Sequence, residues 1–176
     1  GIHDPDKMPF YFPWSTAPAA DLPRNMGIYY WGERARFSPE AWTLDLAVRH
    51  EGRIVGIQGV STHHYTVTHT GETGSWLGRA YQGRGIGTLM RQAICALLFD
   101  QLDAAEVSSA AFTDNPASLA VSRKVGYVEN GTNRVQRRPG ELAFNRRLLL
   151  TPEAFVRPAD PVEVGGAGAL RAAIGL

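Results

Sequence analysis

The 176-residue sequence contains one cysteine, no long hydrophobic run and almost no net charge. One cysteine cannot form an intrachain disulfide, and it leaves a cysteine-based zinc site unsupported. Cys95 has apolar neighbours in RQAICALL, so we expect a buried thiol and not a nucleophile. Without a stretch that could span a bilayer or a signal-peptide pattern, a reducing cytoplasm is the expected location.

The formal net charge of +1 is too small to predict nucleic-acid binding through a strong basic field. The basic stretch NRVQRRPG, residues 133–140, is expected to be an exposed hairpin with solvated arginines. His63, His64 and His69 lack the spacing of metal ligands and are expected on a loop or strand surface, although each could act near neutral pH. The sequence therefore predicts a protein that binds no metal, nucleic acid or membrane.

Much of the chain from residue 43 has the patterns of β-strands. Leu44, Leu46 and Val48 alternate with polar residues, as in a half-buried strand, and a short EGR turn then leads into a second strand of a hairpin. Residues 63–72 are expected to continue as a strand or a long loop. The predicted strands are residues 42–50, 53–61, 73–78, 105–112, 126–138 and 140–150.

Two stretches have the patterns of helices. From Thr88 to Gln101 the apolar residues recur at helical spacing. In the second helical stretch, which follows the 105–112 strand, Asn115 is a predicted N-cap, Pro116 fits the first turn and Gly126 can adopt the left-handed conformation that ends a helix.

The two ends of the chain have no clear period. Residues 1–26 are rich in proline and aromatic residues, and we expect irregular structure with a helical turn near Ala19. The tail of residues 151–176 is rich in proline, glycine and alanine, with a short helix expected near Leu170. The order of strands and helices between them predicts a mixed α/β domain.

A glycine run, YQGRGIGT at residues 81–88, lies between a strand end and a helix start. The first turn of a helix has unpaired N–H groups at the positive end of its dipole, and glycine side chains do not keep an anion away. Gly83, Gly85 and Gly87 are therefore predicted to hold a phosphate or pyrophosphate, with charge from Arg84 and a hydroxyl from Thr88. A tight turn without a ligand is the alternative.

The spacing of the run excludes two common phosphate motifs. The dinucleotide motif G-x-G-x-x-G would need a glycine where Met90 stands, and a P-loop would need a lysine. The remaining pattern is Gln-x-x-Gly-x-Gly, which Gln82, Gly85 and Gly87 satisfy.

With this loop, the sequence resembles the GNAT superfamily of acyl-CoA-dependent N-acyltransferases, in its RimJ/RimL-like branch. Two stretches carry the resemblance over residues 43–150: WLGRAYQGRGIGTLM, and DNPASLAVSRKVGYVENG with its N-x-x-S and K-x-G-Y signatures. It implies one domain over residues 1–176, with a mostly antiparallel sheet, a V-shaped splay between the family's strands four and five, and helices on both faces. The family's first strand and helix have no counterpart here, so we expect the chain to be a fragment.

The resemblance implies transfer of an acyl group, most simply acetyl from acetyl-CoA, to a primary amine by direct attack, without a metal. The acceptor could be a small molecule, a peptide N-terminus or a lysine, and a homodimer is possible within the family. A succinyl-CoA-using enzyme and a non-catalytic CoA-binding sensor remain as alternatives.

The family motifs also assign site residues. Glu72 is the implied general base, and Ser122 stands where many members carry a tyrosine, so its hydroxyl would bond the CoA sulfur. Asn115 would contact the pantetheine as well as cap its helix, while Tyr127 is expected in the core. The strand end that pairs with pantetheine and the pyrophosphate loop comprise Trp76, Leu77, Gly78, Gln82, Gly83, Arg84, Gly85, Ile86, Gly87 and Thr88.

The aromatic stretch MPFYFPW, residues 8–14, belongs to the segment of residues 1–42 that the resemblance places on the acceptor side. Met8, Phe10, Tyr11, Phe12 and Trp14 would there line the acceptor site. Hydrophobic cover over the sheet is the alternative, and the sequence leaves both open.

Overall fold

The computed structural model describes residues 1–4 and 6–176. Its strands form a six-stranded sheet in the order β1-β2-β3-β4-β6-β5, in which only the β3–β4 pair is parallel. This confirms the predicted mixed, mostly antiparallel α/β architecture. The strands are β1 (Thr43–His50), β2 (Arg53–Thr62), β3 (Thr70–Leu77), β4 (Glu106–Phe112), β5 (Val128–Arg138) and β6 (Glu141–Leu150).

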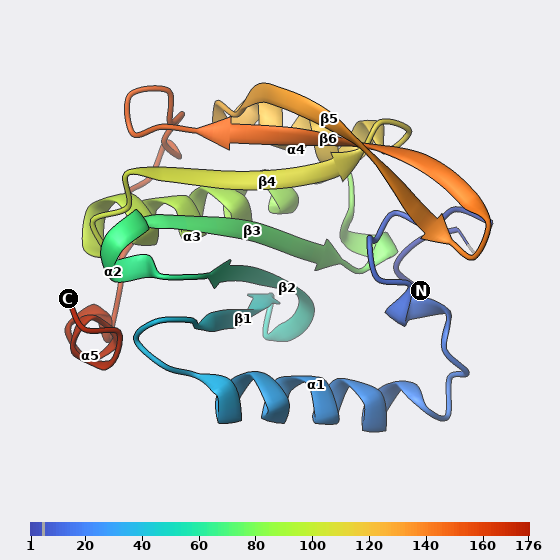
Figure 1. The fold of residues 1–176 in the computed structure, drawn as a ribbon, viewed down its shortest axis with the longest axis horizontal. Helices are drawn as coiled ribbons and strands as arrows, with labels where there is room; N and C mark the ends of the chain where they lie inside the picture. Colours follow the sequence, from blue (N-terminus) through green and yellow to red (C-terminus); the bar gives the residue numbers. More distant parts are fainter. Residues whose placement is uncertain (5) are drawn as a thin grey trace.

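Helices lie against the sheet, with α3 and α4 behind it and α1 beside β1 (Figure 1). In the described part of the chain, no helix is both long and apolar enough to cross a bilayer. The helices are α1 (Leu22–Arg36), α2 (Tyr65–Thr68), α3 (Ile86–Gln101), α4 (Pro116–Val125) and α5 (Ala167–Ala173), with 3₁₀ turns at Trp14–Thr16 and Arg79–Tyr81.

The two faces of the sheet have different chemistry, because successive strand residues point to opposite sides. Val60 and Val107 point to the α3 side and are fully buried in the main core with Ile94 and Leu98 of that helix. The other face carries polar residues of β1, β2 and β3, and α1 lies across it. The register therefore places β3 residues of even number on the face away from α3.

The pairing between β3 and β4 is short. It covers four residue pairs, from Thr70↔Glu106 to Thr73↔Ser109, after which the rest of β3 pairs only with β2. Arg91 of α3 lies where this ladder ends and donates to the hydroxyls of Ser75 and Ser109, each at 3.0 Å. The predicted V-shaped splay would begin where this ladder ends, and the splay itself stays a prediction.

Within the segment of residues 1–42, predicted as irregular and helical, only a turn near Ala19 was located, whereas α1 runs from Leu22 to Arg36. The reason is that α1 buries no apolar stripe: none of its residues is buried, Ile28 is 53% exposed and Trp31 is 70% exposed. The stretch from His63 to Glu72 likewise contains α2, although threonine and valine favour strands. Tyr65 is buried and donates to the Leu102 carbonyl at 3.0 Å, and this tertiary contact overrides the local preference.

The basic hairpin differs from its prediction at Arg137. Its side chain is only 10% exposed, donates to both carboxylate oxygens of Asp114 at 2.8 Å, and lies 4.2 Å from the centre of the Phe112 ring. The expectation of solvated arginines is therefore wrong for Arg137, which ties β5 to the loop before α4. The hairpin itself and its exposed Arg134 are as predicted.

The predicted boundaries of α4 are confirmed. Asn115 accepts a hydrogen bond from the Ser118 N–H at 3.1 Å, Pro116 begins the helix, and Gly126 ends it with φ of 104°. A Cβ at Gly126 would overlap the carbonyl oxygen of Ala154. Glycine is therefore required here by both conformation and space.

Replacing Gly126 by alanine is expected to lower the free energy of unfolding by roughly 2–3 kcal/mol, because left-handed strain and backbone overlap add. Urea unfolding would measure the loss. Gly131→Ala is the matched control, since Gly131 has φ of 98° but open space around its Cβ position. Equal losses in the two variants would contradict the role of the Ala154 contact.

Candidate functional site

The glycine run forms an open loop between β3 and α3. Gly83 and Gly85 have φ of 74° and 83°, and no atom lies within 4 Å of a Cβ built on either one. Gly87 has a different role, because its Cβ position faces Val121 of α4 at 3.6 Å. Two of the three glycines therefore shape the loop, and the third lets α4 pack against the start of α3.

The main-chain N–H groups of this loop are free in the part of the chain that the structure describes. Those from Gly83 to Gly87 donate to no protein acceptor, whereas the N–H groups of Thr88 and Leu89 donate to the Gly85 carbonyl at 3.0 and 3.1 Å. Thr88 can therefore offer an anion its hydroxyl but not its amide. The exposed loop at the start of a 16-residue helix has the features of an anion site.

Gln82 acts as a structural tie. Its side-chain amide donates to the main-chain carbonyls of Leu77 and Ile2, both at 2.8 Å, and thus joins the end of β3 to the N-terminal segment. Arg84 is exposed, with its guanidinium 5.8 Å from the centre of the Tyr81 ring. Ile86 packs against the small cluster around Met90, so its side chain is part of the core.

The end of β3 presents fewer free groups than the motif implied. Trp76 is paired with Ile57 of β2, and the Gly78 N–H donates to the Val55 carbonyl at 2.8 Å, so the main chain of Trp76 and Gly78 faces β2. By the same alternation, the main chains of Ser75 and Leu77 face the β4 side. Sequence reasoning missed Ser75, because only the pairing register identifies it.

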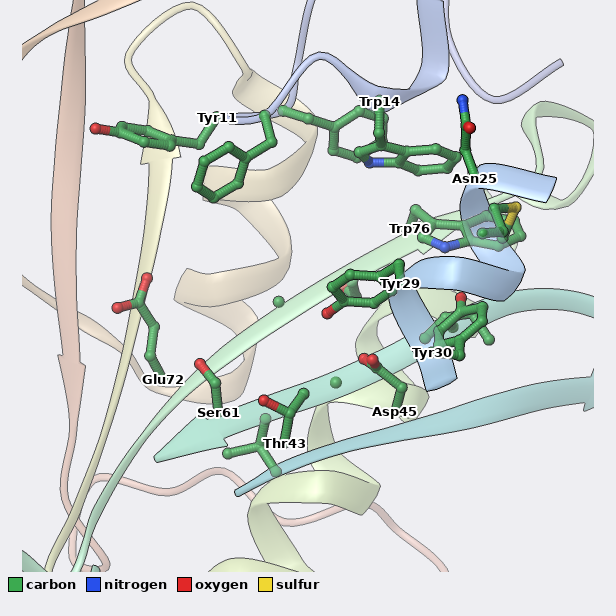
Figure 2. A pocket seen from close by; sticks show the side chains of 18 of the residues that line it. Tyr11, Trp14, Asn25, Tyr29, Tyr30, Thr43, Asp45, Ser61, Glu72 and Trp76 are labelled. Atoms are coloured by element: carbon green, nitrogen blue, oxygen red, sulfur yellow. The ribbon is translucent and has the colours of Figure 1, made fainter. Parts of the chain in front are cut away.

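A cavity of about 430 Å³ lies over the polar face of the sheet, beneath α1 and the aromatic stretch (Figure 2). Phe10, Tyr11, Phe12 and Trp14 line it, whereas Met8 is buried elsewhere. The remaining lining residues are Leu22, Asn25, Met26, Tyr29, Tyr30, Thr43, Asp45, Ile57, Gly59, Val60, Ser61, Glu72, Gly74, Ser75 and Trp76. The aromatic stretch therefore forms a wall of this cavity.

Glu72 lies in this cavity, on the face of the sheet away from α3. It is exposed and opposite Ser61, while the next residue, Thr73, is buried and bonded to the Tyr127 hydroxyl at 2.9 Å. The register thus decides the face, which the sequence alone left uncertain by one residue. None of the three histidines of residues 63–69 lines the cavity, and His69 is hydrogen-bonded to the Asp103 carbonyl.

Asp45 is a second carboxylate in the cavity, near Tyr29 and Tyr30 in Figure 2. Its Oδ2 atom is buried and has no hydrogen-bond partner in the described residues. Burial raises the pKa of Asp45, although the Tyr29 hydroxyl opposes this rise. Burial also raises the pKa of Tyr29, to which the negative charge of Asp45 contributes.

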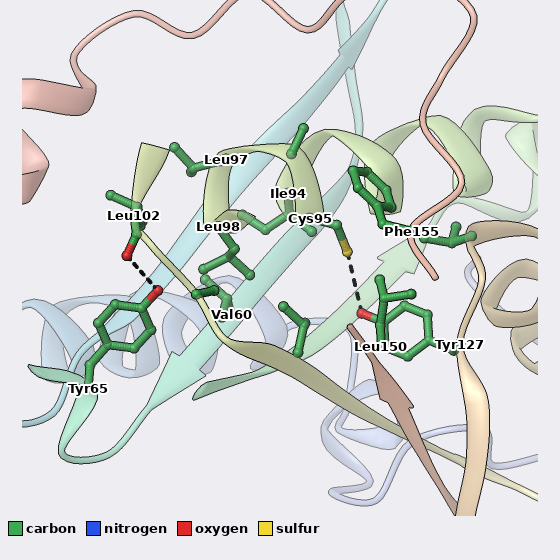
Figure 3. Packing of buried hydrophobic residues seen from close by; sticks show 14 of the residues in the cluster. Val60, Tyr65, Ile94, Cys95, Leu97, Leu98, Leu102, Tyr127, Leu150 and Phe155 are labelled. Carbon is green, nitrogen blue, oxygen red and sulfur yellow. Dashed lines mark hydrogen bonds between the residues drawn. The ribbon is translucent and has the colours of Figure 1, made fainter. Parts of the chain in front are cut away.

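Cys95 and Tyr127 lie in the main core, as predicted (Figure 3). The Cys95 sulfur is 3.4 Å from the Tyr127 hydroxyl, and the thiol is fully buried. Burial raises the pKa of Cys95 to about 11, so the reactive thiolate is scarce at neutral pH. The described part of the chain also has no group of three histidine, cysteine or acidic residues that could hold a metal.

Ser122 and Arg91 are among the buried polar residues on the α3 side of the sheet. Ser122 of α4 is 1% exposed, and its hydroxyl has no partner among the described residues; it does not line the cavity with Glu72. Arg91 is 4% exposed and carries a charge without an acidic partner in the described chain. Sequence reasoning missed Arg91, although an arginine within an apolar helix is a usable signal.

Residues 2–128 match the family described as the acetyltransferase (GNAT) domain. A candidate ribosomal N-acetyltransferase of Bacillus subtilis (strain 168), YdaF, is 26% identical over 92 residues, which are 52% of this chain and 49% of YdaF. The chain thus spans about half the length of this curated relative.

Solved structures share the fold at low sequence identity. RimJ of Mycobacterium smegmatis, in complex with CoA-disulfide, has a TM-score of 0.67 and 20% identity over 94% of this chain and 75% of RimJ. The ribosomal-protein-S5-alanine acetyltransferase of Vibrio fischeri has a TM-score of 0.57 and 17% identity over 78% of this chain and 72% of its own.

Proposed function

Because this chain belongs to the GNAT family of acetyltransferases, we propose that it transfers an acetyl group from acetyl-CoA to a primary amine that attacks the thioester directly. The observation that carries the proposal is the row of free N–H groups from Gly83 to Gly87, placed between the end of β3 and the start of α3. These groups can bind the pyrophosphate of the coenzyme without any change in the protein's own hydrogen bonds.

The coenzyme fits the described residues beyond this loop. The β4-facing main chain of Ser75 and the N–H of Leu77 would pair with the pantetheine arm like an added strand, while the Leu77 carbonyl keeps its bond from Gln82. The buried hydroxyl of Ser122 has no hydrogen-bond partner among the described residues. Because buried hydroxyls are normally hydrogen-bonded, a bound ligand would supply the missing partner. We propose that Ser122 donates to the sulfur, while Asn115 retains its capping bond at the start of the same helix.

The acceptor would enter the cavity on the opposite face of the sheet. There Glu72 would take a proton from the ammonium group, directly or through water, because only the neutral amine attacks. Arg91 lies behind the end of the β3–β4 ladder, and its positive charge would favour departure of the thiolate.

Acetyl is preferred over succinyl for an electrostatic reason. A succinyl group would bring a carboxylate toward Glu72 and Asp45, and no basic residue lines the described cavity. Arg91 is already bonded to two serine hydroxyls and is almost fully buried. A negatively charged acyl chain would therefore be repelled without compensation.

The acceptor class, assembly and domain extent are further proposals. Relatives named as ribosomal-protein acetyltransferases support a peptide N-terminus as an acceptor, beside small amines and lysine. We also propose one domain over residues 1–176, comprising the acceptor-side segment 1–42, the core 43–150 and the tail 151–176. We further propose that the protein is located in the cytoplasm and forms a homodimer.

Binding and turnover test the function separately. Acetyl-CoA at 100 times its Kd should stabilise the protein by about 2.7 kcal/mol, which a thermal-shift assay detects, and NAD should not. Release of free CoA should then depend on an added amine and should be slower with succinyl-CoA. Stabilisation by NAD alone would contradict the coenzyme assignment, and tight acetyl-CoA binding without turnover across an amine panel would favour the sensor.

A further inference from the structure

Asp45 is a carboxylate whose charge the protein leaves uncompensated. None of the ion pairs among the described residues includes it, and one of its oxygens is buried without a hydrogen-bond partner. The acid nearest to it on α1, Glu33, adds further negative potential. A partly buried carboxylate in this condition is costly unless a cation comes to it.

Gly59 makes room for this carboxylate, and Gly74 leaves open space beyond it. Asp45 pairs across the sheet with Gly59, which pairs in turn with Gly74. The Asp45 Oδ1 atom leans over Gly59, where a Cβ would overlap it, and no atom lies within 4 Å of a Cβ built on Gly74. The floor of the cavity beyond Gly59 is therefore bare main chain at Gly74, so a ligand can approach the carboxylate from that side.

Aromatic rings surround the same position. Tyr29 and Tyr30 meet edge to face with 5.2 Å between ring centres, and the ring centres of Trp14 and Trp76 are 5.9 Å apart; all four residues line the cavity. The faces of such rings attract cations, and their area favours alkyl carbon. The lining in the described chain contains two carboxylates and no basic residue. This combination suits a cation carried on an apolar chain.

The second carboxylate lies at a definite separation. Asp45 and Glu72 are two strands apart across the β1–β2–β3 ladder and displaced by two residues along it. Strand spacing and rise put their Cα atoms roughly 12 Å apart. If the reacting amine is at Glu72, a group at Asp45 is at the far end of an acceptor about eight bonds or more in length.

We propose that the Asp45 end of the cavity binds a second positive charge of the acceptor, so that the preferred substrates are amines with another cation roughly 10–12 Å away. This inference rests on the proposed function. A linear diamine or polyamine and a peptide N-terminus followed by a basic side chain carry the same chemistry. The hydrogen-bonded ion pair with Asp45 holds the far cation, while the near amine reacts beside Glu72.

Acceptor selectivity tests the proposal on the unmodified protein. We would measure kcat/KM for α,ω-diaminoalkanes of graded length and for the 1-aminoalkanes of matching length. We expect a preference for diamines of about 10- to 100-fold at the best length, because a hydrogen bond to a charged group is made only by the diamine. A second set of acceptors consists of peptides with lysine or norleucine at the second position. If the preference for lysine over norleucine exceeds that for diamines over monoamines, the second cation comes from a peptide side chain; in the opposite case it comes from a small diamine.

Asp45→Asn then tests the residue. The substitution keeps the side-chain shape and removes a partly buried charge, so folding should be preserved. We expect the diamine preference to fall to near unity, while Glu51→Gln, which removes an exposed carboxylate outside the cavity, should retain it. Calorimetric binding of the best diamine, without acetyl-CoA, should weaken by about 10- to 100-fold in Asp45→Asn.

The outcomes separate the two proposals. No diamine or lysine preference in the unmodified protein, or equal loss for diamines and monoamines in Asp45→Asn, would overturn the second-cation site, and turnover itself would still support the acetyltransferase. Absence of turnover with every amine would count against the proposed function. In that case the calorimetric comparison of diamine binding still decides for or against Asp45.

Discussion

Gly85→Glu is expected to weaken acetyl-CoA binding by at least about 10²-fold, since two like charges 4 Å apart near a protein surface repel by about 4 kcal/mol. The glutamate carboxylate would lie among the free N–H groups that the coenzyme pyrophosphate is proposed to use. Open space around the Gly85 Cβ position means that the new side chain should cause no packing defect. Isothermal titration with acetyl-CoA would measure the loss.

Gly85→Ala separates charge from backbone strain. Gly85 has φ of 83°, so any side chain there costs about 1–2 kcal/mol, but alanine brings no carboxylate. We therefore expect Gly85→Ala to lower stability to a similar extent and to bind acetyl-CoA much more tightly than Gly85→Glu does. Unchanged affinity in Gly85→Glu would refute the pyrophosphate site in this loop.

Glu72→Gln is expected to lower kcat by about 10²–10⁴-fold, which is the usual contribution of a positioned general base. Glutamine retains the size of the side chain and its place opposite Ser61, but it cannot accept the proton of the ammonium group. The KM for acetyl-CoA should be unchanged, because the loop at Gly83–Gly87 is a separate part of the site. Steady-state kinetics near neutral pH would test this.

Glu106→Gln is the matched control for Glu72. Glu106 of β4 pairs with Thr70, two residues before Glu72 on β3, but it does not line the cavity. We expect its kcat to stay within about twofold of the unmodified protein, as for a surface substitution. A comparable loss of kcat in both variants would show that Glu72 acts through the charge of this region and not as the base.

Elements set by neighbouring residues could be predicted from the sequence, whereas elements set by distant contacts could not. The α3 and α4 helices and the hairpins were predicted because periodicity, the Asn115 cap and the Gly126 exit are patterns of neighbouring residues. The α2 helix was missed because a tertiary contact, that of Tyr65 with Leu102, supports it against weak local signals, and α1 was missed because it buries no apolar stripe. Arg137 was misjudged for the same reason as α2, since its partner Asp114 is distant in the sequence.

The sequence by itself determined the family, the class of fold and the loop that offers free N–H groups, because a glycine spacing ahead of an apolar helix is a local chemical fact. Only the tertiary structure decided which carboxylates line the same aromatic cavity. Asp45 and Glu72 come from β1 and β3, and strand register sets both the face on which they lie and their separation. Neither quantity is encoded in adjacent residues, since a shift of one residue in pairing would turn either side chain to the opposite face.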